Sequence, residues 1–336
     1  LQQWTQSEFN RLSATFTQRK IDGCIREGHG DLHLGNVAVV DNMPVFFDCI
    51  EFNADLRWID VMSEAAFLVV DMQAHNRPDF AYRLLNAYLE ASTDYGGIAV
   101  LRFYAVYRLM VRAKVSLMSK PASHSASLPD AFQQYASLAM QWTRPGRANL
   151  ILMHGFSGSG KTCLSHLMLQ EMGALRLRSD VERKRMVGLT PGEMSQSKVG
   201  GDLYADDVTD ATYHRLLELS QSILGAGYSV IVDASFLKTA ERRLFGTWAR
   251  TQGVPHVFVS LAAPEVVLRE RVAHRLQMGV DASDASVAVL NFQLQTHDPF
   301  DADELPRVVR CDSALPINTA DRMGLWQALR DRLSQA

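Results

Sequence analysis

The sequence predicts an α/β protein in which a mainly helical N-terminal part precedes a parallel-sheet domain. Apolar residues recur at helical spacing from Trp58 to Trp142. From residue 149 to residue 336, short apolar runs instead alternate with helical segments, which is typical of a parallel sheet with helices on both faces. With 336 residues, the chain is long enough for two domains that each bury a core.

Composition argues against several classes of protein. Hydrophobic residues make up 47% of the chain and the formal net charge is -3, which fits a globular protein and not a dedicated nucleic-acid binder. No apolar run approaches the ~20 residues that span a bilayer, and no signal peptide is visible. The four cysteines are scattered, with no CxxC pair, as in a reducing compartment. We therefore expect a cytoplasmic protein with no membrane partner.

The N-terminal part is expected to contain a helix, a hairpin and a group of further helices. Residues 1–20 have apolar side chains on roughly one helical face. The apolar runs 37–40 and 45–47, joined by "DNMP", predict a hairpin. The later helices are expected at 59–74, 79–92, 97–118 and 126–142, with a break at 120–127.

A domain boundary is expected at "TRPGRAN", because Pro and Gly interrupt a long helical pattern just before an apolar run. The sequence thus predicts a first domain at 1–142, a linker at 143–148 and a second domain at 149–336. In the second domain, strands are expected at 149–154, 174–178, 228–233, 256–261 and 306–310. Helices are expected at 161–171, 204–226, 239–252, 264–276, 284–296 and 321–334.

The segment "GFSGSGKT" fits the phosphate-binding pattern G-x-x-x-x-G-K-[ST] and lies between a predicted strand and a predicted helix. Small residues let successive backbone N–H groups converge on phosphate oxygens, and the helix N-terminus adds positive potential. We expect Lys161 to reach the β and γ phosphates and the Thr162 hydroxyl to hold Mg²⁺. The predicted nucleotide-binding residues of this P-loop are Gly155, Phe156, Ser157, Gly158, Ser159, Gly160, Lys161 and Thr162.

Two aspartates follow the next predicted strands along the chain. Asp180 lies just past the strand 174–178, where ligands bind in open parallel sheets. It could accept a proton from a substrate hydroxyl, with Arg183 or Arg185 holding the substrate. Asp233 ends the run "VIVD", as in a Walker B strand whose carboxylate orients Mg²⁺. Both aspartates could instead be helix caps.

A pair of arginines suggests how the transferred group is stabilised. Arg271 and Arg275 are spaced i, i+4 and so share one helical face. In a nucleoside-kinase-like fold, a lid at this position supplies arginines to the transferring phosphoryl group. The alternative is an ordinary solvated basic face.

The P-loop, "RSDVER", "VDASFLKTAERR" and the arginine-bearing helix together resemble P-loop kinases of the polynucleotide 5′-kinase, gluconate kinase and zeta-toxin type. The resemblance covers nearly all of residues 149–336. It implies a nucleoside-kinase-like P-loop NTPase fold, ATP and Mg²⁺ as cofactors, Asp180 as general base and Arg183 as a substrate ligand. The acceptor would be a hydroxyl-bearing small molecule or a 5′-hydroxyl end. Nothing obvious builds the basic, aromatic-lined channel of a nucleic-acid strand, so nucleic acid is not favoured.

A second motif, "HGDLHLGN" at 29–36, resembles the catalytic loop of the aminoglycoside phosphotransferase family. The resemblance implies that Asp31 accepts the proton of a substrate hydroxyl and that Asn36 ligates Mg²⁺. Asp48, after the predicted hairpin, falls where that family has its second Mg²⁺-binding aspartate. Residues 1–142 would then form the C-terminal lobe of such a kinase.

The ATP-holding N-terminal lobe of that family is missing from this sequence, because only 28 residues precede His29. Since the sequence begins with Leu1 and not Met, we expect a trimmed or degenerate lobe. The order of the two parts resembles bacterial proteins in which an aminoglycoside-phosphotransferase-like domain precedes a P-loop predicted kinase.

The principal hypothesis from sequence is therefore an ATP-dependent kinase that phosphorylates a hydroxyl through the second domain. One alternative is a nucleotide-dependent switch or ATPase with the N-terminal lobe as a binding module. Another is an aminoglycoside-type phosphotransferase that acts through Asp31.

Overall fold

The computed structural model separates the chain into two compact units, Leu1–Gly146 and Arg147–Ala336. The division falls between residues of the predicted linker 143–148. The structure describes residues 1–118, 130–144, 146–190, 193, 206–278, 285–314 and 319–335. The predicted break at 120–127 lies outside the described residues.

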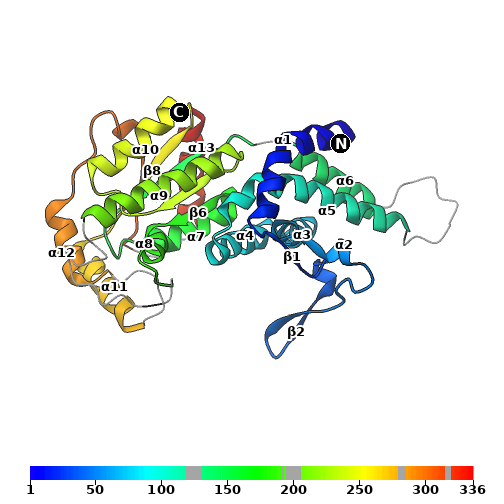
Figure 1. Cartoon of the computed structure of the whole chain (residues 1–336). Helices are drawn as coiled ribbons and strands as arrows, with labels where there is room; N and C mark the ends of the chain where they lie inside the picture. The colour runs from blue at the N-terminus through cyan, green and yellow to red at the C-terminus, as the bar shows by residue number, and fades with distance from the viewer. Residues whose placement is uncertain are drawn as a thin grey trace. The chain divides into compact units, whose positions relative to one another are not determined.

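The first unit is mainly helical (Figure 1). Its core lies where α3, α5 and α6 meet, and it includes Val70, Leu109 and Tyr135 together with buried alanines on all three helices. Alanine has no side chain beyond Cβ, so these helices can approach one another closely. The helices are α1 (Gln2–Ile21), α2 (Ala54–Arg57), α3 (Val61–Ala74), α4 (Pro78–Ser92), α5 (Ile98–Met118) and α6 (Asp130–Trp142), with short turns η1 (Leu34–Asn36) and η2 (Tyr95–Gly97).

Two small antiparallel sheets complete this unit. The hairpin of β2 (Val37–Val40) and β3 (Met43–Phe46) is tighter than the sequence suggested. Asp41 and Asn42 alone make its turn, with φ of 50° and 60°, as a type I′ turn requires. Apolar side chains on both strands, Val39 and Met43 among them, are exposed.

The second small sheet was not predicted. It pairs β1 (Ile25–Glu27) with β4 (Trp58–Asp60). The helix expected from residue 59 therefore begins at Val61, after Asp60, whose carboxylate accepts a hydrogen bond from the Met62 N–H at 2.9 Å.

The second unit contains a five-stranded parallel sheet in the order β6-β7-β5-β8-β9, which confirms the predicted fold class. Buried runs of aliphatic residues form the central strands, as expected for a sheet covered on both faces. The strands are β5 (Leu150–His154), β6 (Leu175–Arg178), β7 (Val230–Asp233), β8 (His256–Ala262) and β9 (Val308–Asp312).

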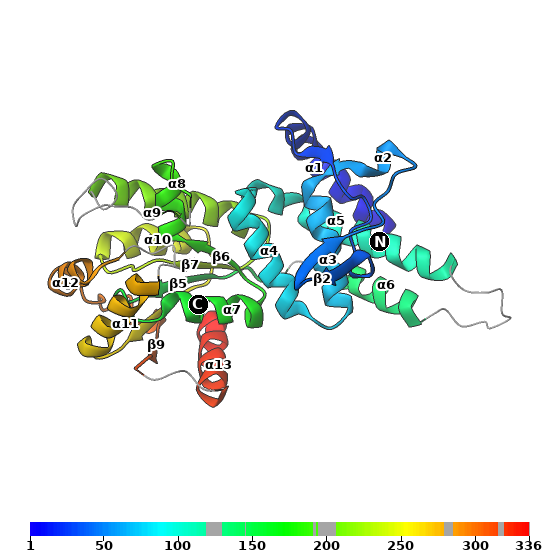
Figure 2. The ribbon, with the colours of Figure 1, turned by 90° about the horizontal axis from the view of Figure 1, so that it is seen from below.

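Helices cover both faces of this sheet. Figure 2 shows α9 and α10 on one face, and α7 and α13 on the other. Their bounds are α7 (Lys161–Met172), α9 (Asp206–Gly225), α10 (Thr239–Thr251) and α13 (Thr319–Gln335), and the remaining segments are α11 (Glu265–Met278), α12 (Val287–Thr296) and the turn η3 (Leu305–Arg307). Among the described residues, no helix is both long enough and apolar enough to span a bilayer.

One helix of this unit was not predicted. α8 (Ser179–Met186) follows β6 without a loop and carries the charged sequence SDVERKRM. Eight residues are too few, and these are too polar, for a clear apolar period. Its side chains are nevertheless largely buried, including Glu182 and Lys184. α8 therefore places Asp180 in its first turn, directly beyond the sheet.

Candidate phosphoryl-transfer site

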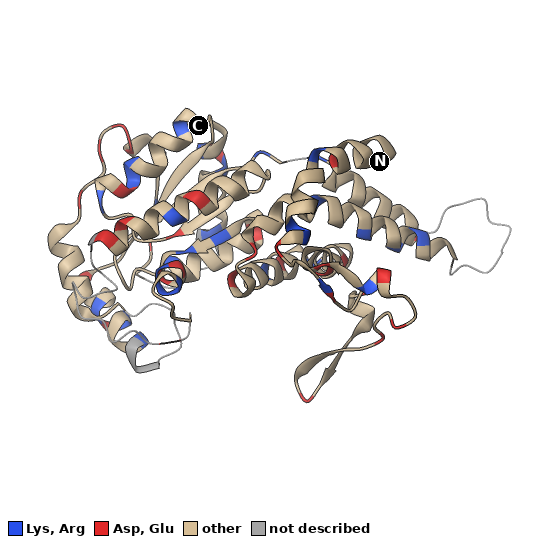
Figure 3. Ribbon diagram, viewed as in Figure 1, with Lys and Arg blue, Asp and Glu red and all other residues tan. Residues whose placement is uncertain are grey.

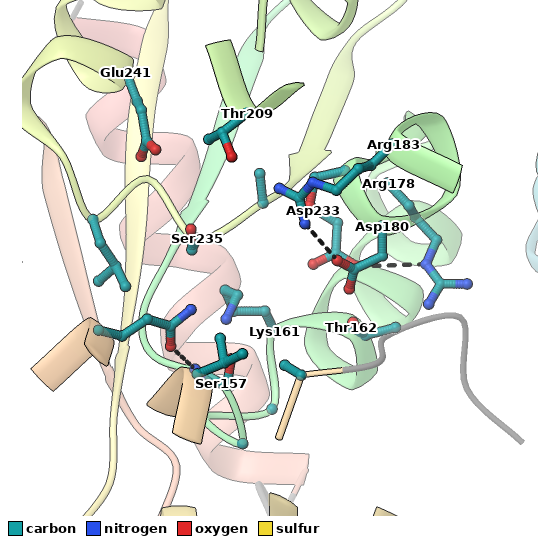
Figure 4. A pocket seen from close by; sticks show the side chains of 18 of the residues that line it. Ser157, Lys161, Thr162, Arg178, Asp180, Arg183, Thr209, Asp233, Ser235 and Glu241 are labelled. Atoms are coloured by element: carbon teal, nitrogen blue, oxygen red, sulfur yellow. Dashed lines mark hydrogen bonds and ion pairs between the residues drawn. The ribbon is translucent and has the colours of Figure 1, made fainter. Parts of the chain in front are cut away.

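The carboxyl ends of three neighbouring strands bring the sequence-predicted residues of the second unit together. The P-loop follows β5, Asp233 ends β7, and Asp180 follows β6. A cavity of about 780 Å³ opens at this edge of the sheet. Its lining includes Lys161, Thr162, Asp180, Arg183, Asp233, Arg271 and Arg275 (Figure 4).

The P-loop has a backbone shape that only glycine adopts readily. Gly155, Gly158 and Gly160 have φ of 145°, 82° and 89°. A Cβ on Gly158 would lie 2.6 Å from the Leu268 carbonyl oxygen, and one on Gly155 would lie 2.7 Å from that of Leu261. These glycines therefore let the loop pack closely against β8 and α11. Gly158 and Gly160 also line the cavity, where bare backbone allows close approach of a phosphate.

Contacts from α12 and from the loop after β7 hold the P-loop. Gln293 on α12 accepts the Ser157 N–H at 2.9 Å, and the Gly155 N–H donates to the Ser235 carbonyl at 3.1 Å. Phe156 packs edge-to-face on His297, with 5.1 Å between ring centroids. The buried Ser159 hydroxyl has no hydrogen-bond partner in the described part of the chain.

The Lys161 ammonium group closes the loop on itself. Its Nζ donates to the carbonyl oxygens of Gly155 at 2.7 Å and Phe156 at 2.9 Å. Burial lowers the pKa of Lys161 to about 8, while the nearby carboxylates of Asp233 and Asp180 act in the opposite direction.

Nucleotide affinity should therefore fall above about pH 8. Below that pH the free protein already carries the ammonium charge that attracts phosphate, whereas above it the proton must be taken up on binding. We expect the affinity for a non-hydrolysable ATP analogue to be level from pH 6.5 to 7.5 and to drop up to about tenfold per pH unit above pH 8. Titration calorimetry in buffers of different ionisation enthalpy measures both the affinity and the proton uptake. An affinity that stays constant up to pH 9.5 would contradict the assignment of this pH dependence to Lys161. The same fall of affinity with pH in Lys161→Ala would also contradict it.

Oxygen ligands suited to Mg²⁺ lie beside the P-loop. Asp233 is buried, and its Oδ2 lies 3.2 Å from the Ser165 hydroxyl and 3.9 Å from Arg178 Nε. Thr162, in the first turn of α7, lines the same cavity. Mg²⁺ in nucleotide sites keeps several waters and takes only one or two protein oxygens, so a hydroxyl and a carboxylate fit it. Larger groups of potential metal-binding His, Cys, Asp and Glu side chains are absent from the described residues.

Asp180 and Arg183 lie one helical turn apart on α8. Arg183 NH1 lies 3.4 Å from Asp180 Oδ1. The carboxylates of Asp180 and Asp233 both lie near enough to Lys161 to raise its pKa, and Figure 4 shows these side chains at the cavity. A hydroxyl held beside Asp180 would be near both the predicted metal ligands and the phosphate-binding loop.

Both predicted lid arginines of α11 line the cavity. Arg271 donates to the Ser313 carbonyl at 2.7 Å and reaches the Gly158 carbonyl at 3.5 Å. Arg275 donates to the Ala285 carbonyl at 3.0 Å. α11 thus connects the P-loop to the segment that follows β9.

Sequence reasoning assigned no role to several other side chains that line the cavity. Arg178, Ser235 and Glu241 lie within the segments "RSDVER" and "VDASFLKTAERR", but nothing in those segments marks them as lining residues. Thr209, Tyr213 and Gln293 come from helices that are distant in the chain, and no local motif marks them.

The loop "HGDLHLGN" lies in the first unit and is closed by its own hydrogen bonds. Asn36 is buried and donates through Nδ2 to the Asp31 carbonyl at 3.0 Å. His33 Nε2 lies 3.6 Å from Asp31 Oδ2 and lowers the pKa of that carboxyl. The Phe47 N–H donates to the Asn36 carbonyl, so the exposed Asp48 follows on the adjoining backbone.

The family match found by comparison with known proteins lies within the second unit. Residues 150–300 match the family described as an AAA domain. An uncharacterized protein of Mycobacterium tuberculosis is 32% identical over 235 residues, which cover 68% of this chain and 47% of that protein. The chain thus spans about half the length of the curated relatives it matches.

Two solved structures align with more than half of this chain. A gluconokinase from Sinorhizobium meliloti is 24% identical and aligns with 57% of this chain and 99% of its own, with a TM-score of 0.39. The APS kinase of Mycobacterium tuberculosis is 20% identical, with coverages of 56% and 99% and a TM-score of 0.38. The family match, the strand order and the P-loop together make residues 150–300 an α/β P-loop domain.

Proposed function

We propose that residues 149–336 form an ATP-dependent kinase that transfers the γ-phosphoryl group to a hydroxyl of its acceptor. The main support for this proposal is that the required groups line one cavity. It combines a phosphate-binding loop with a carboxylate for the metal and a second carboxylate for the acceptor, all at one edge of the sheet. A simple nucleotide switch needs the first two of these groups but not the third.

Each side chain has a defined task in this proposal. Asp180 takes the proton of the acceptor hydroxyl, whose oxygen forms a bond to the γ-phosphorus while the bond to the β–γ bridging oxygen breaks. Lys161, Arg271 and Arg275 stabilise the negative charge on the transferring group, and Arg183 holds the acceptor. Thr162 and Asp233 would hold Mg²⁺, which neutralises charge between the β and γ phosphates.

An ADP-formation screen with purified protein tests this function. The panel holds sugars, nucleosides, an oligonucleotide with a 5′-hydroxyl and aminoglycosides. We expect one class to stimulate ADP formation at least about tenfold over the rate without acceptor, and mass spectrometry to find the phosphorylated product. Lys161→Ala should lower that rate by about 10²- to 10³-fold, because a buried cation is removed from the developing charge. Lys114, outside the P-loop, supplies the matched control Lys114→Ala.

Two other outcomes would replace the proposal. ATP hydrolysis that no acceptor accelerates would indicate a nucleotide-dependent switch or ATPase. Phosphotransfer that survives Lys161→Ala but not Asp31→Asn would place the chemistry in the N-terminal loop. One observation favours that second candidate: His33 helps to keep Asp31 ionised, as a general base must be, with Asn36 and Asp48 as the proposed Mg²⁺ ligands on adjoining backbone.

A further inference from the structure

The cavity is also lined by a connected set of three polar side chains, which we call the acceptor wall: Tyr213, Ser235 and Glu241. The Tyr213 hydroxyl lies 3.2 Å from Ser235 Oγ and accepts the Phe236 N–H at 3.2 Å. These contacts join α9 to the loop after β7. Figure 4 shows Glu241 beyond Ser235, far from Asp180, with its carboxylate directed toward the cavity.

The Glu241 carboxylate is built to accept hydrogen bonds from a ligand. Its Oε2 accepts the Lys238 N–H at 3.2 Å at the start of α10. Burial raises its pKa, which the Lys238 N–H, the Tyr213 hydroxyl and the charge of Arg183 oppose. An ionised carboxylate has about four lone-pair sites, so donors from a ligand in the cavity can add to these contacts.

Three of the cations that line the cavity each lie beside a carboxylate. Arg183 lies 3.4 Å from Asp180, Arg178 lies 3.9 Å from Asp233, and Lys238 lies 3.8 Å from Asp298. α8 itself carries both signs close together (Figure 3). An anionic acceptor would therefore approach cations that already face carboxylates, and it would also meet the charge of Glu241. A cationic acceptor would be repelled by the positive charges of Arg178 and Arg183.

Apolar side chains also line the cavity, and the space is limited. Leu237, Val289 and Phe292 are among them. Apolar and aromatic walls with a few placed polar groups are typical of small-molecule sites of about 300–1,000 Å³. The cavity of about 780 Å³ must also hold the phosphates, so the acceptor end suits a molecule of sugar size, with C–H faces for the apolar wall and hydroxyls for Glu241.

We propose that the acceptor is a small uncharged polyol, a sugar or an alditol, and that Glu241 selects it by accepting hydrogen bonds from its hydroxyl groups. This inference rests on the proposed kinase function and adds the class of substrate to it. Glu241 is a specificity residue here and takes no part in the proton transfer at Asp180.

The test compares acceptors of one carbon skeleton: glucose and glucitol as neutral probes, gluconate and glucose 6-phosphate as anionic probes, and glucosamine as a cationic probe. The full chain is assayed for ADP formation as wild type, Glu241→Gln and the control Glu218→Gln, which changes an exposed carboxylate on α9. Glutamine keeps an oxygen for the Lys238 N–H, so the start of α10 is preserved. We expect a neutral probe to have the highest kcat/KM, and Glu241→Gln to lower it by about 10- to 100-fold with the KM for ATP unchanged.

The outcomes separate the inference from the function on which it rests. Preference of the wild type for an anionic or cationic probe would overturn the neutral-polyol assignment and leave the kinase function standing. An unchanged kcat/KM for the neutral probe in Glu241→Gln would overturn the role of Glu241. If no probe stimulates ADP formation, the neutral-polyol assignment fails, and the kinase function fails with it only if the nucleosides, oligonucleotide and aminoglycosides are also inactive. Thermal melting of each variant, and Ser235→Ala as a second change in the acceptor wall, distinguish a specificity effect from misfolding.

Discussion

Changing Asp180 to asparagine will lower kcat for acceptor phosphorylation by about 10²- to 10⁴-fold, the usual contribution of a general base. Asparagine has the same shape and keeps an oxygen for Arg183, which lies 3.4 Å from Asp180 Oδ1. It cannot take up the proton of the acceptor hydroxyl. The affinity for ATP should stay within about twofold, because the loop that binds phosphate follows a different strand.

Steady-state kinetics with saturating ATP and a titrated acceptor measure this effect. Asp210→Asn, at an exposed position of α9, is the matched control and should behave as wild type. Full kcat in Asp180→Asn would show that another group takes the proton. A loss confined to the KM of the acceptor would make Asp180 a binding residue.

Changing Arg242 to alanine will destabilise the second unit by about 3–5 kcal/mol, as expected when one partner of a buried ion pair is removed. The Arg242 side chain is fully buried. Its Nε donates to Glu304 at 2.9 Å, and its other nitrogens donate to backbone carbonyls that include those of Phe236 and Pro299. The truncation would leave the buried Glu304 carboxylate without this partner and the loop after β7 without an anchor.

The neighbouring arginine provides the control for this prediction. Arg243 pairs with Asp301 at 2.8 Å, but its side chain is 67% exposed, so Arg243→Ala should cost at most about 1 kcal/mol. Denaturant unfolding followed by circular dichroism gives both values. If both variants lost the same free energy of unfolding, burial would not explain the contribution of Arg242 to stability. For a unit of this size, the fall in Tm expected for Arg242→Ala is roughly 10 °C.

The nucleotide half of the site could be predicted from sequence because its signals are local. The P-loop is contiguous, and buried strands mark where Asp180 and Asp233 follow. Tyr213 of the acceptor wall has no such signal, since it looks like any aromatic residue on an amphipathic helix. The Gln293 side chain meets the Ser157 N–H from 136 residues away, a contact that only the tertiary fold creates.

The difference in burial between Arg242 and Arg243 could be predicted in part from the sequence. Arg242 shares a helical face with Phe245 and Ala249, at i+3 and i+7, and all three are buried. An arginine at a core position of an amphipathic helix is a candidate for a buried ion pair. Its partner Glu304 lies beyond three further elements, β8, α11 and α12, so the pair itself could not be predicted from a local pattern.

The strand order has a consequence for how this domain could acquire new substrates. β5 lies at the centre of the sheet, β6 and β7 lie on one side of it, and β8 and β9 lie on the other. The polar acceptor contacts proposed here come from segments that follow β6 and β7, whereas α11, which carries the lid arginines, follows β8. Exchange of the segments after β6 and β7 between homologous domains should therefore change which alcohol is phosphorylated. The lid arginines on α11 would stay in place.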